Sequence, residues 1–251
     1  MSDLDGSHKE QGEGEGARRL NRPLSLVAAV VEDLIERVAR GEFRSAQPFV
    51  NETKLGLDYG VSRPVIREAL RTLADKGMIT VRHGRGTVVN EREEWDLVDP
   101  EVLSALVAQD RSPEVLSQLI RVRAAVEAEL ARAATENMSD ADRAHLQALF
   151  DELVAYQNEI ARYQPTDRAF HDHIMRCSNN PFGRVIVRKV SAWSRAAPRP
   201  LGYDPREVAV SLAGHRHILA AILARDPIAA AEAMRAHILD SWAERLRIGN
   251  L

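Results

Sequence analysis

Asp167, His171, His215 and His237 have the side-chain types and the spacing to bind a divalent metal ion. Asp167 and His171 are four residues apart in a helical pattern, which places their side chains on one face, with Cβ atoms roughly 5–6 Å apart. His215 falls on an apolar stripe and His237 stands beside Met234, so both can point into a protein interior. Three imidazoles and one carboxylate suit zinc, nickel, manganese or iron. The same spacings also fit hydrogen-bonded core histidines, and spacing alone leaves both interpretations open.

A second set of side chains, Arg63, Arg67 and Arg71, suits contact with DNA. These arginines recur every fourth residue, so on a helix they form one basic stripe opposite an apolar face. A guanidinium can bond O6 and N7 of guanine together, which contributes about 1–3 kcal/mol of base discrimination. The helix would begin at Ser62, where its N-terminus favours a phosphate. The alternative is a solvated basic face, and the neighbouring segments decide between the two.

Those neighbouring segments predict a winged helix-turn-helix. Apolar spacing predicts helices over residues 25–40 and 52–59, and a third from Ser62 to about residue 76. Two β-branched runs, residues 78–82 and 87–90, then predict a hairpin. In this fold the second helix of the pair enters the major groove of DNA. The arginine stripe lies on that helix, which favours DNA contact over a solvated face.

The predicted hairpin has a glycine-rich tip formed by His83, Gly84 and Arg85. Glycine removes side-chain bulk, so this tip can approach the minor groove or the phosphate backbone closely. We therefore include all three residues in the predicted DNA-binding surface.

The histidines require a different scaffold, because everything beyond residue 100 has helical periodicity. Breakers such as residues 179–181 and 198–205 separate the segments. The predicted helices span residues 100–109, 113–136, 139–163, 165–178, 181–197, 204–224 and 226–248. Short connections between them predict an antiparallel bundle whose central cavity could hold a ligand.

Length and composition predict two domains and a mainly α protein. The chain has 251 residues, 45% of them hydrophobic and only 5% aromatic. We expect a disordered tail over residues 1–22, a DNA-binding domain over 23–91 and a helical effector and dimerisation domain over 92–251. Cys177 is the single cysteine, so it can form no internal disulfide and is expected to be a buried, inert thiol.

Charge is distributed unevenly along the chain. Residues 18–90 carry 13 Lys plus Arg against 8 Asp plus Glu, although the whole chain has a net charge of -3. The basic segment confines nucleic-acid contact to the first third of the chain. No apolar run is long enough for a membrane span or a signal core, so we expect a cytoplasmic protein.

The N-terminal motif resembles the signature of the GntR superfamily of bacterial transcription regulators. The resemblance spans residues 24–90 and is carried by residues 60–70, Leu73, residues 76–77 and residues 84–89. It implies operator contacts by two of the predicted arginines, Arg63 and Arg67, and by the wing residues His83 and Gly84. One departure is Thr53, which stands where members often have an arginine at the start of the second helix.

The C-terminal half is similar to the FCD effector domain of the FadR-type GntR subfamily. The matching blocks are Asp167-x-x-Phe170-His171, Asn180-Pro181, residues 215–222, Asp226, residues 230–231 and Met234-x-x-His237. In that domain an Asp and three His bind a divalent metal, which implies Asp167, His171, His215 and His237 as ligands, with zinc expected on purification. His173 and His217 are then expected not to be ligands.

The resemblance also implies an effector-binding arginine. Residues 121–127 resemble the start of the same domain, and Arg123 takes the position that pairs with the effector's carboxylate. The alternative for Arg123 is an exposed surface arginine. Arg121 departs from the family, which usually has Glu there. Residues 95–103 resemble the join in regulators of sugar-acid catabolism, which implies an aldonate or similar hydroxy acid.

These observations predict a ligand-responsive repressor of a catabolic operon. Two copies would place their third helices on half-sites of a palindromic operator, and carboxylate binding would change their separation. Two alternatives are a metal-dependent hydrolase, since an open metal site can activate water, and a regulator whose metal only braces the bundle.

Overall fold

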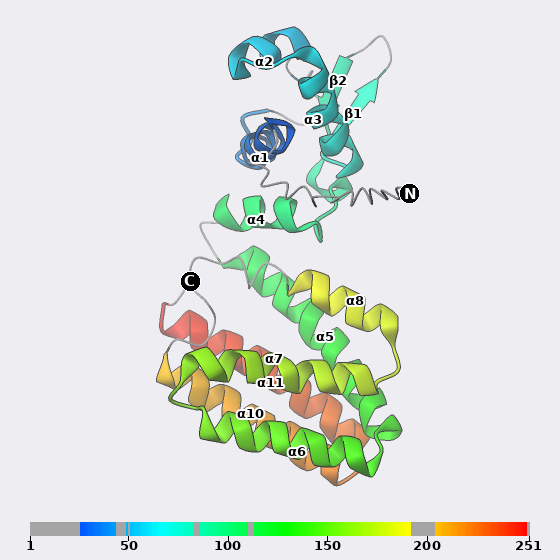
Figure 1. The fold of residues 1–251 in the computed structure, drawn as a ribbon, viewed down its shortest axis with the longest axis vertical. Coiled ribbons are helices and arrows are strands. Elements are labelled where there is room, and N and C mark those ends of the chain that lie inside the picture. The colour runs from blue at the N-terminus through cyan, green and yellow to red at the C-terminus, as the bar shows by residue number, and fades with distance from the viewer. Residues whose placement is uncertain are drawn as a thin grey trace, which may run out of the picture.

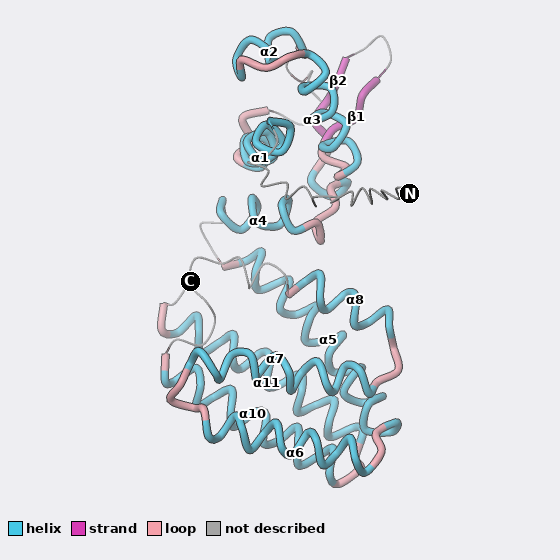
Figure 2. Tube along the Cα trace, in the orientation of Figure 1, coloured by secondary structure: helices cyan, strands magenta, loops and turns pink. Residues whose placement is uncertain are grey.

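The computed structural model describes residues 26–43, 49, 51–82, 86–109, 113–191 and 204–249. The predicted tail at residues 1–22 and the wing tip formed by His83, Gly84 and Arg85 lie outside these residues. Within them, an N-terminal module with the only β-hairpin stands above a C-terminal bundle of helices (Figures 1 and 2). The predicted mainly α architecture, a winged helix-turn-helix joined to an all-helical bundle, is confirmed.

The N-terminal module consists of three helices and a two-stranded antiparallel sheet. Its elements are α1 (Leu26–Ala39), α2 (Glu52–Tyr59), α3 (Arg63–Asp75), β1 (Ile79–Arg82) and β2 (Gly86–Val89). The strands pair with Ile79 opposite Val89 and Arg82 opposite Gly86. Side chains from all three helices and from both strands form one hydrophobic core.

Local signals set the sharp turn between α2 and α3. The Asn51 side chain caps α2 by accepting a hydrogen bond from the Thr53 backbone N–H at 2.7 Å. Gly60 ends α2 in the left-handed region with φ +63°. Leu55 and Ile66 are then fully buried on either side of the turn, which fixes α3 against the core.

A short linker holds the end of α3 against the next helix, α4 (Pro100–Gln109), after a single 3₁₀ turn at Arg92–Glu94. Lys76, directly after α3, forms ion pairs with Asp99 (Nζ to Oδ2, 2.6 Å) and Glu101 (Nζ to Oε2, 3.0 Å). Gly77 lies so close to the linker that a Cβ atom there would be 2.3 Å from the Glu94 carbonyl oxygen. The end of α3 and the start of α4 are therefore joined by both side chains and backbone.

The helix α4 contributes to both hydrophobic cores. Val102, Ala105 and Leu106 are buried in the N-terminal core, against α1, whereas Leu103 is buried in the core of the bundle. In Figure 1, α4 lies between the N-terminal module and the bundle. The sequence places α4 in the effector domain, but most of its buried side chains pack against the DNA-binding module.

The bundle is built from long helices that pack around one core. They are α5 (Glu114–Asn137), α6 (Asp140–Ala155), α7 (Ile160–Cys177), α8 (Pro181–Val190), α10 (Pro205–Leu223) and α11 (Pro227–Arg247). The helix α11 packs extensively on both α5 and α10, and α7 packs on α5 and α6. None of the described helices has the length and apolar composition needed to cross a bilayer.

The break between α6 and α7 is not where the sequence predicts it. The sequence predicts helices over 139–163 and 165–178, which puts the break at residue 164, but α6 ends at Ala155 and α7 runs from Ile160 through Pro165. Pro165 lies in the second turn of α7, where the missing N–H removes one backbone hydrogen bond without ending the helix. Tyr163 therefore lies on the same helix as Asp167 and His171 and faces the same cavity.

Candidate functional site

The three predicted DNA-contacting arginines lie together on the outer face of α3. Arg63, Arg67 and Arg71 are all exposed. The opposite face of α3 is buried in the N-terminal core through Ile66, Ala69, Leu70 and Leu73. The structure thus brings the basic stripe to the surface, as a groove-reading helix requires.

Arg67 is held by a weak partner in the absence of DNA. Its Nε lies 3.0 Å from Oε2 of Glu52, and the two side chains are 71% and 42% exposed. Such an exposed pair contributes about 0.2–1 kcal/mol, so a base or phosphate can displace it. Ser62 precedes α3, and its side chain makes no capping hydrogen bond to the helix.

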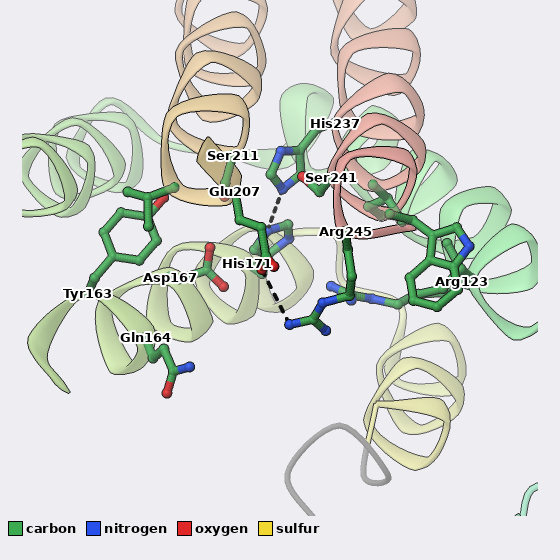
Figure 3. A pocket seen from close by; sticks show the side chains of 14 residues that line it. Arg123, Tyr163, Gln164, Asp167, His171, Glu207, Ser211, His237, Ser241 and Arg245 are labelled. Carbon is green, nitrogen blue, oxygen red and sulfur yellow. Dashed lines mark hydrogen bonds and ion pairs between the residues drawn. The ribbon is translucent and has the colours of Figure 1, made fainter. Parts of the chain in front are cut away.

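The predicted histidines converge from three helices inside the bundle. Nε2 of His171 on α7 lies 3.1 Å from Nε2 of His237 on α11 and 3.2 Å from Nε2 of His215 on α10. Oδ1 of Asp167 lies 3.3 Å from the His215 Nε2. Figure 3 shows His171 and His237 facing one another, with Asp167 on the same helix as His171. All three imidazoles are buried.

The orientation of His171 is set by Glu127, a residue that sequence reasoning did not single out. The Nδ1 of His171 lies 2.9 Å from Oε2 of Glu127. Because an ionised carboxylate can only accept, Nδ1–H donates, and in the neutral ring the Nε2 lone pair faces the other histidines. Glu127 is in turn paired with Arg123, whose Nε lies 2.5 Å from Oε1.

Charge is balanced within this chain of contacts. Burial alone would raise the pKa of Glu127, but the charge of Arg123 and the hydrogen bond with His171 outweigh burial and lower it to about 2. Glu127 also raises the pKa of Arg123, although burial opposes the shift. Both groups are therefore charged at neutral pH, and Glu127 remains an acceptor for His171.

The donor set fits a divalent transition metal. Burial lowers the pKa of both His215 and His237 well below the usual value, and the neighbouring histidines lower it further. Neutral imidazoles are the form that binds metal. Tetrahedral coordination at metal–nitrogen distances of about 2.0–2.1 Å separates the nitrogens by roughly 3.3 Å, close to the Nε2 separations of 3.1 and 3.2 Å. Asp167 supplies a hard oxygen beside them.

A glycine makes room for one of these rings. A Cβ atom at Gly214 would lie 2.4 Å from Nδ1 of His237, so only glycine at this position lets that ring lie against α10. Phe170 packs edge-on against His215 with ring centroids 4.8 Å apart. The Nδ1 atoms of His215 and His237 have no hydrogen-bond partner among the described residues.

A cavity of about 120 Å³ opens beside the histidines. Its lining includes Arg123, Asp167, His171 and His237, so the predicted effector-binding arginine and three of the four predicted metal ligands share one space. A larger hollow of about 700 Å³ shares Arg123, Asp167 and His171 with it and extends along α8. Arg123 is half-buried between these spaces and is not an exposed surface arginine.

The histidines expected not to be ligands lie away from the cluster. The ring of His173 packs between α6 and α7, with Nε2 2.9 Å from the Asp142 carbonyl oxygen, and His217 is exposed. Cys177 is half-buried next to His173, and burial raises the pKa of its thiol. The thiol is therefore protonated at neutral pH and a weak nucleophile.

Comparison with known proteins identifies both halves of the chain. Residues 26–89 match the model of the bacterial regulatory proteins of the gntR family, and residues 118–240 match the model of the FCD domain. The HTH-type transcriptional repressor NanR of Citrobacter rodentium is 30% identical, over 87% of this chain and 85% of the relative. The chain belongs to the GntR family.

Further relatives of this GntR protein are also named as regulators. The galactonate operon transcriptional repressor of Escherichia coli K12 is 27% identical, over 87% of this chain and 96% of that protein. The solved structure of Lar from Listeria monocytogenes is 19% identical, has a TM-score of 0.54, and covers 90% of this chain and 99% of that chain. Lar shares the fold. The GntR chain is a transcription regulator, and the hydrolase alternative gains no support from these relatives.

Several charged residues of this GntR protein lie in the site although sequence reasoning did not predict them. Glu127 could have been found from its position four residues after Arg123, on the same helical face. Arg245 falls on the apolar stripe of Ile238 and Trp242, and a charged residue in such a stripe indicates a buried site. Glu207, its partner across the cavity, offers no such sequence signal.

Proposed function

We propose that this GntR protein is a repressor of a catabolic operon that senses a small carboxylate, such as a sugar acid, through a bound divalent metal ion. One observation carries the proposal: three imidazole nitrogens and a carboxylate converge beside a cavity that Arg123 also lines. The 27% identity to the galactonate operon repressor supports the sugar-acid class.

Operator reading falls to the N-terminal domain, residues 23–91 in this proposal. Ser62 and the exposed arginines Arg63, Arg67 and Arg71 lie along one edge of α3, where they contact base edges and phosphates. The wing residues His83, Gly84 and Arg85 add contacts next to the groove. Two copies of the chain pair so that two α3 helices meet half-sites about one helical turn apart.

Effector sensing falls to the bundle, within residues 92–251. Asp167, His171, His215 and His237 would hold the metal ion, which when bound supplies a Lewis-acid centre for carboxylate oxygens. Arg123 offers its guanidinium to the same carboxylate and orients it. Glu127 fixes both Arg123 and the ring of His171, so the effector's binding groups are positioned before it arrives.

Effector binding reaches DNA through α4 and the linker. The helix α4 is buried in both cores, and an ion pair from Lys76 joins its start to the end of α3. A shift of the bundle helices would therefore move the α3 helices that contact DNA. Coupling of about 1–3 kcal/mol would change operator affinity about 5- to 150-fold.

Fluorescence anisotropy with the DNA upstream of the chain's own gene tests the proposal. The zinc-loaded protein should bind this duplex in preference to a scrambled duplex, and gluconate should weaken binding only while the metal is present. An absence of sequence preference in every ligand state would refute the regulator. A response to gluconate that survives chelation would show instead that the metal is a structural brace.

A further inference from the structure

The cavity beside the histidines contains polar atoms that the protein itself leaves without partners. Nε of Arg245 and Oγ of Ser241 are buried and have no hydrogen-bond partner among the described residues. Both residues lie on α11, four positions apart, and both line the 120 Å³ cavity. Figure 3 shows them on α11 among the labelled residues of the cavity wall. They lie beyond residue 240, where the match to the FCD model ends.

Arg245 is more deeply buried than an arginine with one partner should be. Its side chain is 5% exposed, and Nη2 lies 3.3 Å from Oε2 of Glu207, also almost fully buried. Burial outweighs the attraction of Glu207 and lowers the pKa of Arg245. Buried guanidinium donors without acceptors are costly, so a polar group that enters the cavity gains by bonding them.

The charges around the cavity restrict what that polar group can be. Arg123 already faces Glu127, and Arg245 already faces Glu207, so each guanidinium is neutralised. With neutral imidazoles, a divalent ion beside Asp167 leaves a single positive charge. One carboxylate cancels this charge, and a second would be buried without a counter-charge.

A hydroxyl group matches the unpaired atoms best. It can accept from Nε–H of Arg245 and donate to a carboxylate oxygen of Glu207, and Ser241 Oγ can do either. A hydrocarbon chain at the same place would displace water and leave these donors unmet.

We propose that Ser241, Arg245 and Glu207 form a hydroxyl-binding subsite, and that the effector is therefore a monocarboxylic acid bearing hydroxyl groups. This inference rests on the proposed function, because it takes the effector's carboxylate to bind at the metal and Arg123. The subsite makes the protein reject unsubstituted acids, and the charge balance around the cavity makes it reject diacids of the same length.

Isothermal titration calorimetry on the zinc-loaded full-length protein tests the specificity with two matched sets of acids. The six-carbon set is gluconate, hexanoate and adipate, and the three-carbon set is glycerate, propionate and malonate. In at least one set the hydroxylated acid should bind at least tenfold more tightly than both others, because a site built to hydrogen-bond a hydroxyl rejects analogues without it. Equal affinities within both sets, or tighter binding of the diacids, would overturn the subsite.

Two variants connect this preference to the named residues. Ser241→Ala removes an unpartnered hydroxyl, so the fold should be retained, while the preference for gluconate over hexanoate falls at least threefold. The double variant Glu207→Gln/Arg245→Gln removes both charges together and leaves no uncompensated ion. It should reduce the preference, measured as the ratio of gluconate affinity to hexanoate affinity, at least tenfold. Ser104→Ala, at an exposed serine of α4, is the matched control.

The outcomes separate this inference from the proposed function. Metal-dependent binding of acids with no preference for hydroxyl groups, or with a preference that survives both variants, would refute only the subsite. Failure of every acid to bind, or binding that is the same after chelation, would refute metal-dependent carboxylate sensing itself.

Discussion

The arginine stripe of α3 and the histidine cluster of the bundle hold their functional groups in opposite ways. Arg63, Arg67 and Arg71 are exposed, and Arg67 forms an exposed ion pair with Glu52. His171, by contrast, is buried and linked to Glu127, and through it to Arg123. The side chains that face DNA are thus loosely held, whereas the groups of the proposed effector site are fixed by buried contacts before any ligand binds.

Substitution of two arginines of the exposed stripe should cause a large loss of operator affinity. Arg63→Ala combined with Arg67→Ala should lower operator affinity roughly 30- to 20,000-fold, since two guanine contacts contribute about 1–3 kcal/mol each. The melting temperature should stay the same, because both side chains are exposed. Anisotropy and thermal denaturation measure the two quantities. Arg121→Ala, at an exposed arginine of α5, is the control, and unchanged operator binding by the double variant would contradict the assignment.

A substitution next to the buried histidine cluster should lower metal affinity through its effect on a neighbouring ligand. Glu127→Gln removes the carboxylate that orients His171 and should weaken metal affinity about 10- to 100-fold. Competition with a chromophoric chelator measures this loss. Glu129→Gln, on the exposed side of the same helix, should have no effect. Equal metal affinity in the two variants would mean that Glu127 only neutralises Arg123.

The ion pair between Lys76 and Asp99 is intermediate between these two sites in burial, because the two side chains are 13% and 19% exposed. Burial opposes ionisation, but Lys76 and backbone N–H groups lower the pKa of Asp99. Its stabilising effect is thus present above the ordinary aspartate pKa and is lost as the pH falls through the lowered value.

Asp99→Asn keeps the cap of α4 and removes only the charge. It should lower the free energy of unfolding by about 1 kcal/mol at pH 7. Urea denaturation should show that the difference from the unchanged protein shrinks as the pH falls towards 3. A difference independent of pH would contradict an ionic origin.

The smallest expected effect concerns the exposed pair itself. Glu52→Gln releases Arg67 and removes a negative charge next to the DNA, so operator affinity should rise by up to about 5-fold, the equivalent of about 1 kcal/mol. Anisotropy at low and moderate salt measures it. Asp58→Asn, at the other end of α2, is the control. Weaker binding by Glu52→Gln would show that Glu52 itself takes part in recognition.

Much of this arrangement follows from the sequence because its signals are periodic. The spacing of Arg63, Arg67 and Arg71 predicts an outward face, and the apolar stripe around His215 predicts an inward one, and the structure places both so. Resemblance to a family was needed to favour a metal site over a set of hydrogen-bonded core histidines, because the spacing of imidazoles does not show which helices meet.

Other features depend on packing between distant segments, which local patterns do not encode. The sequence predicts a helix boundary at residue 164, yet α7 continues through Pro165, with Tyr163 and Phe170 buried on its inner face. Glu207 meets Arg245 only because α10 and α11 pack side by side. Such pairs between residues that are distant in the sequence can be identified only once the packing of the helices is known.

Because α4 packs in both hydrophobic cores, its position matters for the design of chimeras that exchange domains between regulators. A chimera joined at residue 91 would pack Val102, Ala105 and Leu106 against the DNA-binding module of another protein. Its own α1 would lose these contacts. A junction after Gln109 would transfer the DNA-binding module together with α4. The structural unit that binds DNA therefore extends one helix beyond the β-hairpin, to the end of α4.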